Sequence, residues 1–251
     1  MLRFRLAQLY IPLCLLASAA HAQEPVVQVL YSERPPYLLL SADGGPGGLT
    51  GAPATRAFKQ AGITVRWLNL PTNRQLLTIR DSKLPSCAIG WFRTPERDSY
   101  AKFSRALYHD KEWAVLANST LAEQAPGSLQ ELMQRKDVRI LVKDNYSYGS
   151  EMTKILARAN PVIAVSTAPT GKMVQSISKG AADMMFVSEE EGGYIMDHHP
   201  SEQTRHLRLL HFKDLPRGGE RYLMCNMAMP DAYMERLNSA LASPVSAAAS
   251  H

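Results

Sequence analysis

An arginine follows a predicted strand at a spacing that suits the binding of an anion. Residues 86–91, SCAIGW, form a short apolar run that indicates a buried strand, and the polar turn FRTPER follows directly. Pro95 favours the first position of a helical turn, with Thr94 as its N-cap. Backbone amides, the Thr94 hydroxyl and the Arg97 guanidinium are then expected near one point, and a guanidinium matches the planar shape of a carboxylate. A surface ion pair between Arg97 and a carboxylate of the same turn is the alternative.

The same segment resembles a stretch of a known family. Thr94 and Arg97, then Phe103 and Ser104, match in order the Thr-x-x-Arg and Phe-Ser-x-x-Tyr pattern of bacterial periplasmic solute-binding proteins, extracellular solute-binding family 3. Tyr108 comes one residue late for that pattern. The resemblance implies that Thr94 and Arg97 hold the α-carboxylate of a ligand, and that Phe103 and Ser104 need only pack before the hinge.

Residues 1–22 have the features of a secretory signal. Arg3 and Arg5 precede a short apolar run, and the small-residue sequence AHA ends at Ala22, where we expect cleavage. The run is too short for a membrane span. Cleavage leaves about 229 of the 251 residues, and the loss of two arginines lowers the formal net charge from +5 to +3. That charge is too small and too scattered to indicate nucleic-acid binding. The signal predicts a periplasmic protein, and the remaining length is enough for a large core.

Two successive runs of strands and helices predict two parallel sheets with helices on both faces. The first run has predicted strands at 25–31, 63–70 and 86–91. The second has predicted strands at 138–142, 162–165 and 184–187. The resemblance implies an α/β, two-lobe periplasmic-binding-protein-like (type II) fold, each lobe a mostly parallel sheet, with a two-strand hinge. We expect lobe 1 in residues 23–115 and 217–251, and lobe 2 in residues 116–216.

Two cysteines remain after the expected cleavage, because Cys14 lies in the signal. An oxidising compartment favours a disulfide between Cys87 and Cys225, and two buried free thiols are the alternative. We predict the disulfide because Cys225 falls in a late strand that should return to the lobe of Cys87.

Other ligand contacts of lobe 1 are expected at the carboxyl ends of its strands. Tyr31 and Tyr37 flank a turn-rich loop and can stack on a ligand, or simply pack there. Trp91 ends the strand that leads to Arg97. Arg74 begins a predicted helix, either as a surface cation or, as the resemblance implies, near the cleft.

In lobe 2 the loop at 144–149 joins a strand to a helix N-terminus, which suits an anion. The resemblance places this loop opposite Arg97. We predict Ser147 as a direct ligand contact and Tyr148 as a lid or stacking group; a helix cap is the alternative for Ser147. Amino-acid binders of the family carry an Asp where Ser188 stands, and Glu189 could replace that Asp. We prefer a structural reading in which Ser188 caps the next helix.

No cofactor or metal is expected, because Asp197-His198-His199 has no third ligand at a suitable spacing. We expect a monomeric solute-binding protein that closes over a small polar, carboxylate-bearing, amino-acid-like ligand and serves an ABC permease or a membrane sensor. One alternative is a dehydratase-like enzyme that uses Glu189 as its acid. Another is an accessory module, if Trp91, Phe92 and Tyr148 crowd the cleft.

Overall fold

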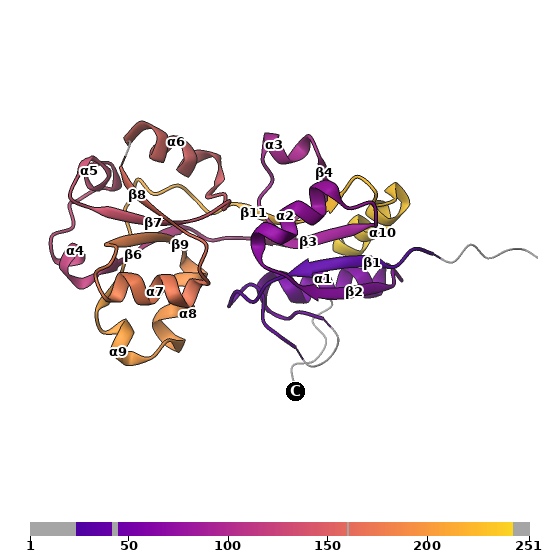
Figure 1. The fold of residues 1–251 in the computed structure, drawn as a ribbon, viewed down its shortest axis with the longest axis horizontal. Coiled ribbons are helices and arrows are strands. Elements are labelled where there is room, and N and C mark those ends of the chain that lie inside the picture. Colours follow the sequence, from indigo (N-terminus) through magenta and orange to yellow (C-terminus); the bar gives the residue numbers. More distant parts are fainter. Residues whose placement is uncertain (1–23, 42–44, 160, 243–251) are drawn as a thin grey trace, which may run out of the picture.

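The structure is a computed structural model that describes residues 24–41, 45–159 and 161–242. Two β-sheets, each with helices on both faces, lie end to end as two lobes (Figure 1). The expected signal at 1–22 and the tail at 243–251 lie outside the described residues. Within the described ranges, no helix is long and apolar enough to cross a bilayer.

The first sheet has the strand order β2-β1-β3-β11-β4, and β5 pairs with β11. Its strands are β1 (Val27–Tyr31), β2 (Val65–Asn69), β3 (Ser86–Trp91), β4 (Ala101–Phe103), β5 (Tyr108–His109) and β11 (Glu220–Asn226). One face is covered by α1 (Gly48–Gln60) and α10 (Asp231–Ala242), and the other by α2 (Thr72–Asp81). The short helix α3 (Pro95–Asp98) follows β3. Because helices cover both faces, the central strand β3 is buried almost along its whole length.

The second sheet has the order β10-β6-β9-β7-β8. Its strands are β6 (Trp113–Asn118), β7 (Arg139–Lys143), β8 (Val162–Ser166), β9 (Met184–Ser188) and β10 (Leu207–Leu210). One face packs on α4 (Ser119–Glu123), α5 (Leu129–Gln134) and α6 (Gly149–Ala159). The other side holds α7 (Thr170–Ser178), α8 (Glu189–His198) and α9 (Ser201–Thr204).

The expectation of mostly parallel sheets was wrong in one respect. Strands β1, β2 and β3 are parallel, as are β7, β8 and β9, but β6, β10 and β11 pair antiparallel to their neighbours. Both sheets are therefore mixed, because the strands that adjoin the interlobe crossings, β6 and β11, run antiparallel to the strands of the βα units. The expected end of lobe 1 at residue 115 also falls inside β6, which pairs with β9 from Trp113 onward, so the crossing precedes Trp113.

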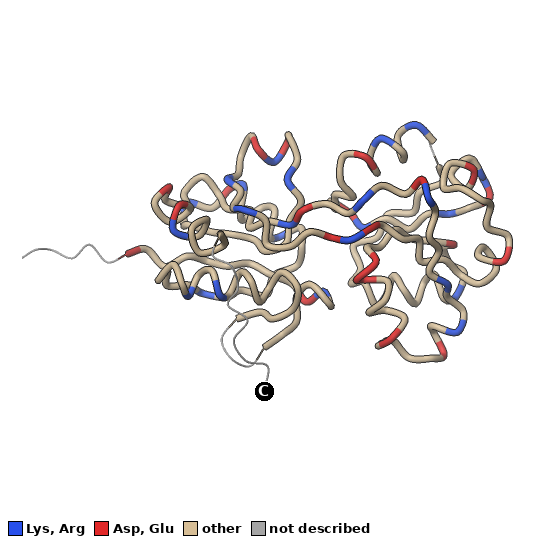
Figure 2. Tube along the Cα trace, turned by 180° about the vertical axis from the view of Figure 1, so that it is seen from behind, with Lys and Arg blue, Asp and Glu red and all other residues tan. Residues whose placement is uncertain are grey.

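Two segments cross between the lobes and pair with each other. Glu112 and Arg217 form an antiparallel bridge, and the backbone N–H of Gly218 donates to the carbonyl of Lys111 at 3.0 Å. Figure 2 shows that these segments carry charges of both signs. The crossings thus form the two-strand hinge that the resemblance implied.

The predicted disulfide is confirmed. Cys87 on β3 and Cys225 on β11 are partners in the antiparallel register, and their sulfur atoms lie 2.06 Å apart. Both residues are fully buried in the first core.

Thiol labelling should find no free cysteine in the exported protein. Because the bridge is buried, the assay must be run under denaturing, non-reducing conditions, with a reduced sample as the control that gives two labels per chain. Two labels without reductant would contradict the bridge.

Candidate functional site

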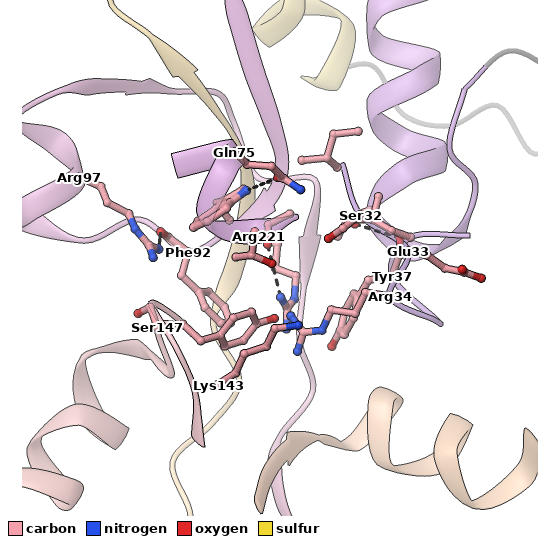
Figure 3. A pocket seen from close by; sticks show the side chains of 17 residues that line it. Ser32, Glu33, Arg34, Tyr37, Gln75, Phe92, Arg97, Lys143, Ser147 and Arg221 are labelled. Atoms are coloured by element: carbon pink, nitrogen blue, oxygen red, sulfur yellow. Dashed lines mark hydrogen bonds between the residues drawn. The ribbon is translucent and has the colours of Figure 1, made fainter. Parts of the chain in front are cut away.

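A partly open cavity of about 50 Å³ lies where the two lobes meet (Figure 3). Its walls come from the loop after β1, the end of β3, and Arg97 of α3 in the first lobe, with Lys143, Tyr146 and Ser147 from the second. A second cavity of about 390 Å³ adjoins it and shares Ser32, Glu33, Thr72 and Lys143 with the first. The carboxyl ends of parallel strands therefore line both cavities, as in other open α/β sheets.

Arg97 reaches the cavity from the turn that the sequence predicts. The Thr94 hydroxyl caps α3 by accepting from the backbone N–H of Arg97 at 3.2 Å. The Arg97 guanidinium donates to the carbonyl of Phe92 at 2.7 Å and lies over the Trp91 ring at 4.8 Å. Only 7% of Arg97 is exposed, and burial lowers its pKa, but a guanidinium stays charged in proteins. The site therefore holds a desolvated positive charge.

A second buried arginine, Arg221 on β11, lines the same cavity. It donates to both oxygens of Asp110 at 2.7 Å, and both side chains are almost completely buried. Its guanidinium lies over the rings of Tyr37 at 3.9 Å and Phe92 at 4.5 Å. Gly90, whose carbonyl faces Arg221 at 3.4 Å, has φ +79°, and a Cβ there would lie 3.1 Å from the Thr50 hydroxyl. Only glycine suits that position.

Direct bonds hold the lobes together around the cavity. Arg34 of the first lobe donates to both carboxylate oxygens of Glu191 in the second, at 2.8 and 2.6 Å. The Tyr37 hydroxyl donates to Ser188 Oγ at 2.6 Å, and the Asn73 amide to Asp144 at 3.0 Å. These contacts join side chains of opposite lobes, so they form only when the cleft is closed.

Glu191 stays ionised despite its burial. Burial alone would raise its pKa, but the charge and hydrogen bonds of Arg34, with Arg221 and Lys143, hold the pKa below its usual value. Burial raises the pKa of Tyr37, so its hydroxyl remains a donor to Ser188. The contact between the lobes is thus a charged pair beside a neutral hydrogen bond.

Several solved structures share this architecture. An ancestral arginine-binding protein bound to arginine superposes with a TM-score of 0.67 and 16% identity, over 88% of this chain and 92% of that one. The arginine-, lysine-, histidine-binding protein ArtJ from Geobacillus stearothermophilus gives a TM-score of 0.67 at 13% identity, over 87% and 88%. The fold is that of the two-lobe periplasmic binding proteins.

A further structure with the periplasmic-binding-protein fold is the ancestral amino acid-binding protein AncCDT-1, a precursor of cyclohexadienyl dehydratase. It superposes with a TM-score of 0.64 at 14% identity, over 86% of this chain and 87% of that one. No protein-family model matches the chain, and no curated protein sequence matches it.

Four of the predicted ligand contacts line the interlobe cavity of this periplasmic-binding-protein fold: Arg97, Trp91, Tyr37 and Ser147. Ser147 Oγ also accepts from the backbone N–H of Gly149 at 3.3 Å, close to the start of α6. Tyr37 is buried and bridges to the second lobe through Ser188, so it is a closure contact as well as a wall of the cavity.

The structure places four other predicted contacts away from both cavities, and Thr94 serves only as the cap of α3. Tyr31 packs against the first core, and Arg74 lies exposed on α2. Tyr148 turns into the second core beside Trp113 and Phe186, where its hydroxyl accepts from the backbone N–H of Lys143. Glu189 contacts His211 Nε2 at 2.5 Å at a surface cavity near the hinge.

Sequence reasoning missed Arg34, Lys143 and Arg221. Arg34 lies in the loop after β1 and Lys143 ends β7, so their place at the carboxyl ends of strands was an available signal. Arg221 sits on a strand that returns from the second lobe, and nothing in its local sequence indicates burial. Among the described residues, no group of three or more His, Cys, Asp or Glu residues could hold a metal ion.

The prediction that Ser188 caps a helix is confirmed. Ser188 Oγ accepts from the backbone N–H of Glu191 at 3.2 Å, while the Glu191 carboxylate crosses the cleft to Arg34. Ser188→Ala should therefore lower the free energy of unfolding by about 1 kcal/mol for the cap, with a further loss because the Tyr37 hydroxyl keeps only the longer bond to Glu190, at 3.4 Å.

The matched control for this variant is Ser128→Ala, because Ser128 caps α5 at a surface position far from the cleft. Chemical denaturation should find Ser188→Ala the more destabilised of the two. Equal losses in both variants would contradict the role of the bond from Tyr37.

Proposed function

We propose that the protein is a periplasmic solute-binding protein that captures a small polar, carboxylate-bearing ligand in its cleft. The ligand is of amino-acid size and is passed to an ABC permease or presented to a membrane sensor. The observation that carries this proposal is Arg97, a buried guanidinium that lines the interlobe cavity, donates to the neutral carbonyl of Phe92 and has no carboxylate within ion-pair distance among the described residues. The arginine-binding proteins of the same fold support a role in solute capture.

Binding in such a cleft requires movement of the lobes. The cavity of about 50 Å³ between the lobes has room for only a few water molecules, which is less than an amino acid needs. Rotation about the hinge at Glu112 and Arg217 would separate the lobes and expose Arg97 to the ligand. Closure would then bring Ser147 and Lys143 onto a ligand that Arg97 already holds. We also propose that the protein is exported through the signal at residues 1–22 and that it is a monomer.

Binding rather than catalysis is proposed because neither Glu189 nor Glu191 is placed as a free acid in the cleft. Glu189, the candidate acid of a dehydratase-like enzyme, contacts His211 outside the cavity. Glu191 is buried and ionised, and Arg34 occupies both of its oxygens. A general acid must carry a proton and reach the substrate, and neither carboxyl group does so here.

A thermal-shift screen of the exported chain against amino acids, polyamines and organic acids tests the proposal. A ligand that binds only the folded state stabilises it by mass action, by about 2.7 kcal/mol at one hundred times its Kd. We expect a saturable rise in melting temperature with at least one carboxylate-bearing compound. The absence of any shift across the panel would favour an accessory or interaction module instead.

A further inference from the structure

The charges around the interlobe cavity are strongly unbalanced. Its lining includes four cationic side chains and one carboxylate, that of Glu33. Glu33 is exposed, and Figure 3 shows its side chain directed away from the guanidinium groups of Arg34 and Arg221. The cationic side chains are Arg34, Arg97, Lys143 and Arg221.

Two of these four charges are already neutralised within the chain. Arg34 forms a two-pronged ion pair with Glu191, and Arg221 forms one with Asp110. Glu191 and Asp110 are both buried, so neither carboxylate is available to a ligand without the loss of an existing ion pair.

The other two charges have no carboxylate within ion-pair distance among the described residues. Arg97 donates to the carbonyl of Phe92, which is neutral. The Lys143 ammonium forms no hydrogen bond within the part of the chain that the structure describes, although the side chain is half-buried and lines both cavities. Burial, and then the charge of Arg34, lower the pKa of Lys143, and the charge of Glu191 opposes this shift only in part. Arg97 follows β3 in the first lobe and Lys143 ends β7 in the second.

We infer that the ligand is a compact dicarboxylate, with one carboxylate on Arg97 and the other on Lys143. This rests on the proposed function and specifies the class of its ligand. Each acid group would gain a charge-assisted hydrogen bond to a cation that has no carboxylate within ion-pair distance among the described residues. Because the two cations come from different lobes, a dianion between them would also draw the cleft closed.

A ligand with an ammonium or guanidinium group fits this cavity poorly. Such a cation would enter among four positive side chains, and the one carboxylate in the lining, that of Glu33, is exposed and directed away from the guanidinium groups of Arg34 and Arg221. To use Glu191 it would have to displace Arg34, which makes two hydrogen bonds of 2.8 and 2.6 Å and also lies over the Tyr146 ring at 4.3 Å. Arginine and glutamine are therefore expected to bind more weakly than a dicarboxylate of similar length.

Calorimetry with defined probes tests the inference. The exported chain is titrated with malonate, succinate, glutarate and adipate, with the monocarboxylates butyrate and pentanoate, and with arginine and glutamine. The variant is Lys143→Met, and the control is Lys154→Met, which removes a lysine that pairs with Glu151 on the surface of α6. We expect succinate or glutarate to bind about 10- to 100-fold more tightly than the monocarboxylate of equal length. Lys143→Met should abolish that difference, and Lys154→Met should preserve it.

Three results would overturn the inference in distinguishable ways. Tight binding of arginine or glutamine without dicarboxylate binding would refute the ligand class and leave the proposed function intact. A dicarboxylate preference that persists in Lys143→Met would refute the role of Lys143. Failure of every probe to bind would count against the inference and the proposed function together.

Discussion

Replacing Arg221 with methionine is expected to lower the free energy of unfolding by about 3–5 kcal/mol. Asp110 is completely buried, and Arg221 supplies two of its hydrogen bonds at 2.7 Å. Without Arg221 the Asp110 carboxylate must either remain charged in a site of low polarity or take up a proton. Methionine fills much of the volume of arginine, so the loss reflects the orphaned charge more than a cavity.

Urea denaturation followed by circular dichroism and tryptophan fluorescence measures this loss. Arg93→Met is the matched control, because Arg93 pairs with Asp98 at an exposed position, where such a pair contributes about 0–1 kcal/mol. The double variant Arg221→Met with Asp110→Asn should recover part of the stability, since no uncompensated charge remains. If Arg221→Met lowered the free energy of unfolding no more than Arg93→Met does, the buried pair would not stabilise the fold.

Replacing Arg97 with alanine is expected to weaken binding of a carboxylate-bearing ligand by about 2–5 kcal/mol. The ligand carboxylate would be desolvated on closure without its charge-assisted hydrogen bonds. Arg97→Lys should restore only part of the affinity, because an ammonium cannot form the planar fork of a guanidinium. Stability should fall by only about 1 kcal/mol, since the guanidinium makes a single backbone hydrogen bond, to Phe92.

Calorimetry with the compound that gives the largest thermal shift measures this effect. Arg74→Ala is the control, because Arg74 is exposed on α2 and lines neither cavity. An unchanged affinity in Arg97→Ala, with the fold intact, would place the binding site elsewhere.

The features that depend on neighbouring residues were predictable from the sequence. The order of Trp91, Thr94, Pro95 and Arg97 predicted a buried strand, a capped turn and an arginine at the cleft, and the structure has all three. The alternation of strands and helices likewise predicted two α/β units. These inferences use short-range sterics and hydrogen bonding, which a local sequence determines.

The features that depend on closure of the two lobes were not predictable. Arg34 and Glu191 are 157 residues apart and lie on different lobes. Their pairing can be predicted only when the relative position of the two lobes is known. Glu189 was predicted as a contact instead of Glu191, and residues two apart on a helix point in nearly opposite directions. Tyr148 was predicted as a lid or stacking group. It comes three residues after Asn145, whose φ of +55° interrupts the extended backbone. The alternation of side chains along a strand therefore could not predict the direction of the Tyr148 ring.

The position of β11 has a consequence for how the chain matures. This strand lies between β3 and β4 in the first sheet, yet it follows the whole second lobe in sequence. During synthesis the first sheet therefore remains incomplete, with one edge of β3 unpaired, until the last part of the chain emerges. The second sheet is continuous in sequence from β6 to β10 and can form earlier. A chain truncated before residue 220 would leave β3 as an unpaired edge strand, and such strands promote aggregation.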